Sequence, residues 1–267
     1  MKRLLGIVLV IGLASAAAWL YLVRDPAPPQ GLSPVPKKAD YRWVDNLYSR
    51  NPGEVDAATR EVTRRGAAAL PIIQAALRDP QSEADRLKGA LKACTILGRT
   101  AEPAIPEVAS VLTEPGLTAE AAIALSYMGP AAFDPLREGL WHEDPIVRRE
   151  SLRSIGKLKE RAALDASAVV KVLIQSLKDR DDGVRTVAAT YLGILHAAPE
   201  ESVPALIVGL SDANEEVRRE SATALGSFGP DGLPALPMLR EAARDKNEEV
   251  AREAGRSIVR LQEKREK

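Results

Sequence analysis

The sequence is poor in the residues that most catalytic and metal sites use. Its 267 residues include one cysteine, Cys94, and two histidines, His142 and His196, which lie far apart in the chain. A single cysteine excludes an internal disulfide, and two distant histidines without a cysteine pair do not form a zinc motif. Phosphate-binding glycine-rich loops and the nucleophile motif of serine hydrolases are also missing. The sequence therefore predicts a protein that is not an enzyme and that needs no cofactor or metal.

Aromatic residues and net charge are scarce as well. Aromatic side chains make up 4% of the chain and half of them precede residue 51, so the remainder must build its core from Ala, Leu, Val and Ile. Such a core suits thin layers of helices. Lys plus Arg and Asp plus Glu number 37 each, so no bulk attraction to nucleic acid is expected.

One long run without charged residues lies at the N-terminus. Lys2 and Arg3 precede residues 4–23, which are uncharged and would span roughly 30 Å as a helix, the thickness of a bilayer core. We interpret residues 1–24 as a signal anchor, with the N-terminus in the cytoplasm and the rest outside it, in the periplasm of a two-membrane bacterium. The alternative is a signal peptide cleaved near its alanines, which gives a secreted protein.

Proline is concentrated directly after this run. Residues 25–38 read DPAPPQGLSPVPKK, which has almost no apolar periodicity and is typical of an extended spacer. We therefore divide the chain into a membrane helix at 1–24, a Pro-rich linker at 25–40 and a folded repeat domain at 41–267.

The folded part of the sequence repeats. Val147, Val184, Val217 and Val250 recur at intervals of 33 to 37 residues. Each is followed by a small residue four positions on and by Ile or Leu eight positions on, which marks one stripe of a helix. A second helical pattern follows each stripe after a Gly or Pro break, and no segment alternates long enough to be a strand. The repeating unit is therefore a pair of antiparallel helices.

Helix pairs of this length cannot bury their apolar faces alone, so neighbouring units must stack. The sequence thus predicts an all-α fold, an α-solenoid of stacked antiparallel helix pairs preceded by the N-terminal membrane helix. We expect about six pairs and a C-terminal capping helix, with first helices near residues 53–65, 83–98, 117–128, 145–157, 183–195, 215–228 and 247–263. The residues placed to cap these helices are Asn51, Asp144, Asp182, Asn214 and Asn247.

The later repeats resemble a known family. Their first helices read roughly D-x-x-x-x-V-R-x-x-A-x-x-A-L-G, which is similar to the short HEAT repeats of the phycobilisome-lyase type. One unit carries the pattern in Asp212, Val217, Arg218, Ser221, Ala224, Leu225 and Gly226, and the preceding unit in Asp179, Val184, Arg185, Ala188, Leu192 and Gly193. The unit from His142 lacks the leading Asp, and earlier units match less. Periods near 33 also suit ankyrin and tetratricopeptide repeats, but their signature strings are missing.

The resemblance changes how the charges are interpreted. It implies that a turn Asp and a helix Arg form a ladder between units, so Asp179, Arg185, Asp212, Arg218 and Asp245 are expected to be structural. Arg148-Arg149 and Arg218-Arg219 are each followed by Glu, which predicts solvated, charge-mixed helix faces.

The resemblance also implies a scaffold that binds a protein or peptide, because stacked helix pairs offer an extended surface. An exported enzyme or enzyme subunit resembling the bilin lyases is one alternative, and a purely structural envelope protein is another. We expect the second helices to line the binding surface with their outward residues Gln74, Arg78, Arg137, Glu138, Lys171, Gln175, Arg240 and Arg244. Most of these are basic or amide, which predicts an acidic or mixed-polar partner segment.

Overall fold

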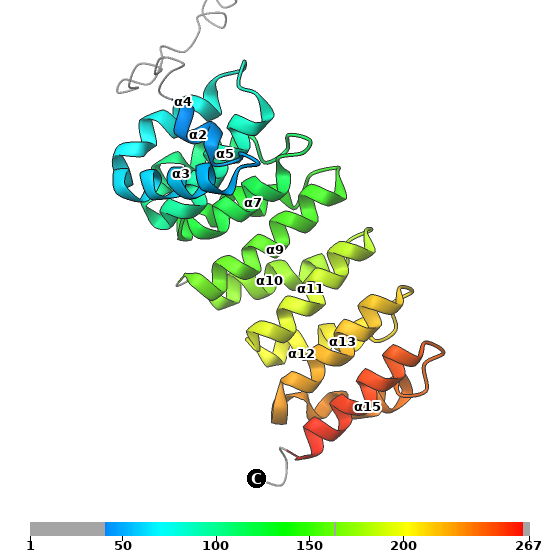
Figure 1. Ribbon diagram of the computed structural model, residues 1–267. Helices are drawn as coiled ribbons and strands as arrows, with labels where there is room; N and C mark the ends of the chain where they lie inside the picture. Colours follow the sequence, from blue (N-terminus) through cyan, green and yellow to red (C-terminus); the bar gives the residue numbers. More distant parts are fainter. Residues whose placement is uncertain (1–40, 163, 264–267) are drawn as a thin grey trace, which may run out of the picture. The chain divides into compact units, whose positions relative to one another are not determined.

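The computed structural model describes residues 41–162 and 164–263, and all regular structure in these two ranges is helical (Figure 1). The first helices of the repeats are α3 (Pro52–Arg65), α5 (Ala84–Leu97), α7 (Thr118–Tyr127), α9 (Pro145–Arg161), α11 (Asp182–Leu195), α13 (Glu215–Ser227) and α15 (Glu248–Glu263). The second helices are α4 (Leu70–Arg78), α6 (Ile105–Ser110), α8 (Phe133–Gly139), α10 (Ala166–Ser176), α12 (Pro199–Gly209) and α14 (Leu236–Ala242). The expected all-α solenoid of helix pairs is confirmed for the described residues.

Shorter elements connect or precede these helices. Four 3₁₀ segments lead into second helices: η2 (Gly66–Ala69), η3 (Gly98–Ala104), η4 (Pro130–Ala132) and η5 (Gly229–Ala235). A short helix, α2 (Arg42–Asn46), packs against α3 and α5 and buries Trp43 and Val44. Trp43 is therefore buried where α2 packs against the first two first helices.

The first helices lie close to the ranges expected from the sequence, and α9 differs most. It continues to Arg161, four residues beyond the expected end. The extension follows from Leu158, which is fully buried one turn after Ile155 and so prolongs the apolar stripe.

The helices form two layers. Each first helix packs against the first helices of the neighbouring units, and Figure 1 shows α9, α11, α13 and α15 lying side by side. Each second helix packs against the first helix that follows it. Small residues allow close approach, since a Cβ atom on Gly193 would lie 2.7 Å from the Ala224 Cβ of the next first helix. A methyl group there would force neighbouring repeats apart.

Helix starts are fixed by capping side chains. Asn51, Asp144, Asn214 and Asn247 each accept a hydrogen bond from a backbone N–H in the first turn of the helix that follows, as expected. The expected cap at Asp182 is wrong. Asp181 has the extended backbone that a cap requires, and its Oδ1 accepts from the Val184 N–H at 3.0 Å, whereas Asp182 is the first residue of α11.

The predicted location needs correction. The sequence indicated a single-pass membrane protein, but no helix in the described ranges is long and apolar enough to cross a bilayer. The helices there are amphipathic: α9, with 17 residues, buries one stripe and carries arginine, lysine and glutamate elsewhere. The run at 4–23 and the expected boundaries at 24 and 40 lie outside the described residues.

Candidate functional site

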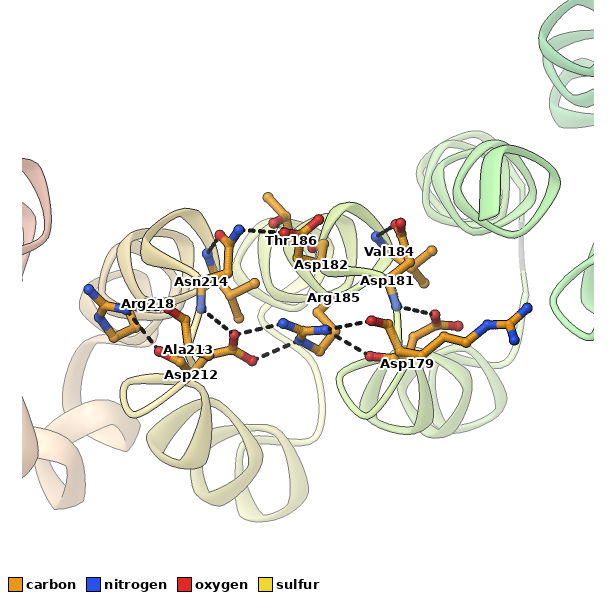
Figure 2. Close-up of polar contacts among 12 residues, drawn as sticks. Asp179, Asp181, Asp182, Val184, Arg185, Thr186, Asp212, Ala213, Asn214 and Arg218 are labelled. Carbon is orange, nitrogen blue, oxygen red and sulfur yellow. Dashed lines mark hydrogen bonds and ion pairs between the residues drawn. The ribbon is translucent and has the colours of Figure 1, made fainter. Parts of the chain in front are cut away.

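A ladder of ion pairs joins the last four units on the side of the turns that precede the first helices. Each rung connects a first-helix arginine to the turn aspartate of the next unit, and the rungs are Arg148–Asp179, Arg185–Asp212 and Arg218–Asp245. In the central rung, Nε and Nη2 of Arg185 donate to the two carboxylate oxygens of Asp212, both at 2.8 Å (Figure 2). Nη1 of Arg185 also donates to the Asp179 carbonyl oxygen at 2.9 Å. This confirms the structural role expected for all of these residues except Arg148.

The ladder corrects one expectation about charge. Arg148 was placed with Arg149 on a solvated helix face, yet Arg148 is only 4% exposed and forms a rung with Asp179. Successive helical residues point about 100° apart, so Arg148 faces the next unit while Arg149 faces solvent beside Glu150. Arg218 and Arg219 divide in the same way.

The rungs are saturated with hydrogen bonds. Burial alone would raise the pKa of Asp212, but the hydrogen bonds from Arg185 and from the Asn214 backbone N–H outweigh burial and lower that pKa. The pKa of Asp179 is lowered in the same way by Arg148 against burial, and Arg218 is the main cause that lowers the pKa of Asp245. These carboxylates are therefore ionised, paired and committed to joining repeats.

A groove of about 1160 Å³ lies between the second helices α8 and α10. It is larger than typical small-molecule pockets, which occupy roughly 300–1,000 Å³. Four of the eight residues expected on the binding surface line it: Arg137 and Glu138 from α8, and Lys171 and Gln175 from α10. The tertiary structure thus brings these four together, and their role in binding remains a prediction.

The other four expected residues lie elsewhere. Gln74 and Arg78 on α4 contact the buried Glu107 of α6: Gln74 Nε2 donates to its carboxylate at 3.3 Å, and Arg78 forms an ion pair with it. These two side chains therefore hold neighbouring second helices together. Arg240 on α14 and Arg244 just after it are exposed and do not line the groove.

Among the groove residues that sequence reasoning missed, Trp141 and Lys178 offer the most to a partner. Trp141 follows α8 and is 74% exposed, which is unusual for so large an apolar side chain. It lies four positions after Arg137, so helical spacing could have placed it on the same face. Lys178 also lines the groove, from the turn just after α10, where helical spacing does not fix the direction of a side chain.

The two walls of the groove differ in charge. Arg137 on α8 is neutralised by an ion pair with Asp134 at 2.9 Å. Lys171 and Lys178 on the α10 side form no ion pair with any residue that the structure describes, and neither does Glu138 on the α8 side. On the α10 wall, Lys171, Lys178 and Arg180 outnumber Asp165, so this wall has a net positive charge. The α8 wall has unpaired Glu138, followed by Glu143.

The cysteine lies outside this groove, inside α5. Burial raises the pKa of the Cys94 thiol to about 12, and the charge of Glu107 adds to the effect. A thiol with so high a pKa is protonated at neutral pH and is a poor nucleophile. Within the described part of the chain, no cluster of His, Cys, Asp and Glu could hold a metal ion.

Comparison with known proteins shows which repeat family the later units resemble. A family profile described as HEAT repeats matches residues 170–259, which include two rungs of the ladder. This stretch of the chain is a HEAT-repeat array. No curated protein sequence matches the chain.

Solved structures share the HEAT-repeat architecture. Kap121p is 15% identical, with a TM-score of 0.60 over 79% of this chain and 28% of its own. A structure of Kap121p bound to Nup53p gives a TM-score of 0.56 at 15% identity, over 79% of this chain and 28% of the other. A chain from the complex of CpcE and CpcF of phycocyanin lyase from Nostoc sp. PCC7120 is 26% identical, with a TM-score of 0.50 over 58% of this chain and 98% of its own. The chain spans under a third of Kap121p.

The array is a repeat scaffold suited to protein binding. HEAT repeats typically serve as non-enzymatic scaffolds, and a lyase chain is also among the similar structures. Fold alone assigns no activity, so function has to be argued from the groove and its residues.

Proposed function

We propose that this protein is a HEAT-repeat scaffold that binds an extended, acidic or mixed-polar segment of a partner protein in the groove between α8 and α10. The observation that carries the proposal is the groove itself, of about 1160 Å³, with Arg137, Glu138, Lys171 and Gln175 on its walls and Trp141 exposed beside it. Its size suits several residues of a peptide better than a small metabolite.

The residues of the groove supply the apolar surface and the charged groups of a typical protein interface. Trp141 and Phe133 offer apolar surface, and exposed tryptophans are enriched among the side chains that dominate binding energy. The free ammonium groups of Lys171 and Lys178 attract carboxylates and raise the rate of association. An acidic partner segment therefore gains charge pairing that the chain itself leaves unsatisfied.

The shared fold supports a binding role. Kap121p, which has the same architecture, has been solved in complex with Nup53p. Stacked helix pairs offer a continuous row of second helices, along which an extended segment can contact several repeats at once.

A displayed library of random peptides tests the proposal directly. The purified protein is panned against the library, and enriched peptides are then tested for binding to the Lys171→Glu/Lys178→Glu double variant. We expect enrichment of peptides with acidic residues and a loss of affinity of about tenfold or more in the double variant. Lys246→Glu is the matched control, because Lys246 is exposed in the turn before α15 and does not line the groove.

Two results would contradict the proposal. One is that the library yields no peptide that binds the wild type more tightly than the double variant. The other is equal loss in the control and the double variant, which would show a general charge effect rather than a site. All three lysines are exposed, so the thermal midpoint should change little and loss of fold will not confuse the result.

A further inference from the structure

The second helices of four successive repeats share one register. Each carries a fully buried leucine at the same place in the repeat: Leu136 in α8, Leu173 in α10, Leu206 in α12 and Leu239 in α14. Two positions beyond that leucine stand Glu138, Gln175, Val208 and Glu241, and five positions beyond it stand Trp141, Lys178, Ser211 and Arg244. Because the leucines all point into the core, the residues two positions beyond them lie on the outward side of the helices. The residues five positions beyond lie in the turns just after the helices and form a second row along the ends of the layer.

Large apolar side chains are exposed most strongly in these rows. Trp141 and Val208 are each 74% exposed, whereas the other exposed large apolar residues in the described ranges reach at most 51%, at Val259 on the first helix α15. A valine on the outer face of α12 adds nothing to the core, and Pro204 one turn earlier is also exposed. The outward face of α12 is therefore apolar in its second half, around Pro204 and Val208, and carries the exposed Glu200 and Glu201 in its first turn. It lacks basic residues, unlike α10 or α14.

Unpaired cations lie on or just after α10 and α14, the second helices on either side of α12. Lys171 lies on α10 and Arg240 on α14, while Lys178 and Arg244 lie in the turns just after these helices. None of the four forms an ion pair within the described part of the chain. Arginines on the outer faces of the first helices are instead paired with glutamates of their own helix, namely Arg149, Arg153, Arg219, Arg252 and Arg256. The four cations on the second-helix side are thus free to pair with a partner, although some first-helix cations, such as Arg60 and Lys157, also form no ion pair within the described ranges.

From this order of side chains we infer that the binding surface continues from the groove across α12 to α14 and that it recognises a spaced pattern. The partner segment presents an apolar residue to Trp141, an acidic residue to the α10 lysines, an apolar residue to Val208 and an acidic residue to the α14 arginines. This inference rests on the proposed function and specifies its partner.

The spacing of the pattern follows from repeat geometry. Neighbouring packed helices lie about 8–10 Å apart. A partner chain in the extended polyproline II conformation advances about 3.1 Å per residue with three residues per turn, so side chains three positions apart share one face. One step between second helices therefore takes about three residues of the partner. The α10 and α12 helices contact each other, and α12 contacts the η5 segment that leads into α14, so the row is continuous beyond the groove.

The test uses two fluorescein-labelled peptides of identical composition. The spaced peptide reads Leu-Ser-Ser-Glu-Ser-Ser-Leu-Ser-Ser-Glu, and the clustered peptide has both leucines at one end and both glutamates at the other. Binding to the full chain is measured by fluorescence anisotropy at low salt. We expect the spaced peptide to bind about tenfold tighter than the clustered one, because only it can reach all four sites together.

Substitutions in the protein test which residues contact the spaced peptide. Trp141→Ala should lower the affinity for the spaced peptide by about thirtyfold, the loss typical of a tryptophan that anchors an interface. Val208→Ser should lower this affinity by about fivefold. Val259→Ser is the matched control and should leave affinity unchanged. In the Lys171→Glu/Lys178→Glu variant, a peptide with lysine in place of its first glutamate should bind better than the original peptide.

The outcomes separate the two proposals. Equal binding of both peptides, or no binding of either, overturns the spaced pattern. If library-selected peptides depend on Lys171 and Lys178 but not on Trp141 or Val208, the spaced pattern fails and the groove function stands. If no selected peptide depends on the groove lysines, the groove function fails as well.

Discussion

The ladder predicts a large loss of stability when Arg185 is replaced by alanine. Arg185 donates two hydrogen bonds to the Asp212 carboxylate and one to the Asp179 carbonyl, and the side chains of Arg185 and Asp212 are each 15% exposed. The variant leaves a nearly buried carboxylate without its cation. Removing one partner of a buried ion pair costs about 3–5 kcal/mol, and we expect about 2–4 kcal/mol here because water can reach the rung and the Asn214 N–H still donates to Asp212.

Urea unfolding at pH 7 measures this loss as a decrease in the free energy of unfolding. Arg252→Ala is the matched control, because Arg252 pairs with Glu249 at 2.9 Å with side chains 49% and 58% exposed. Exposed pairs contribute about 0–1 kcal/mol, so the control should stay within that range. A loss below about 1 kcal/mol for Arg185→Ala, or one equal to the control, would refute the structural role of the rung.

The pH dependence gives a second check on the same variant. The pKa of Asp212 is lowered in the folded protein, so the rung contributes stability above the ordinary aspartate pKa of about 4 and loses it as the pH falls through the lowered value. The difference between the wild type and Arg185→Ala should therefore be full at pH 7 and shrink below about pH 4. A difference that grows in acid would contradict this assignment.

Three further predictions concern the backbone, the core and the thiol. Ala198 has a left-handed backbone (φ 44°, ψ 64°), so Ala198→Gly should raise the free energy of unfolding by about 1 kcal/mol, measured by urea unfolding. Ser221 is buried against Gly209 and its Oγ has no hydrogen-bond partner in the described residues, so Ser221→Ala should change the thermal midpoint little while Ser221→Leu lowers it markedly through overpacking. Cys94 should not react with a thiol reagent at pH 8 unless the protein is unfolded, since burial raises its pKa to about 12; rapid labelling of the native protein would contradict this.

The helices could be predicted from the sequence because each depends on local signals. The stripe through Val217, Ser221 and Leu225 specifies a helix by its own spacing, and Asn214 before it supplies the cap. The cap of α11 was misplaced by one residue, because two aspartates stand side by side and only the backbone conformation of Asp181 distinguishes them. Repetition of the same stripe then implied stacking, since one helix pair cannot bury its apolar face.

The site could be predicted only in part. Outward positions on single helices are visible in the sequence, and Lys171 and Gln175, which line the groove, are predicted as binding residues on this basis. The sequence did not show that Gln74 and Arg78 are engaged by Glu107, because that contact joins residues about thirty positions apart. It also did not show that Arg148 is buried beside Asp179 while Arg149 is exposed.

By itself, the sequence determined the helical repeat unit and its length, because these follow from spacing within and between neighbouring units. The resemblance to HEAT repeats implied the ladder residues other than Arg148. Only the tertiary structure decided that α8 and α10 leave a groove between them and that Trp141 and Lys178 stand on its walls. The distance between two helices depends on how all the intervening side chains pack, and helical periodicity contains no information about that distance.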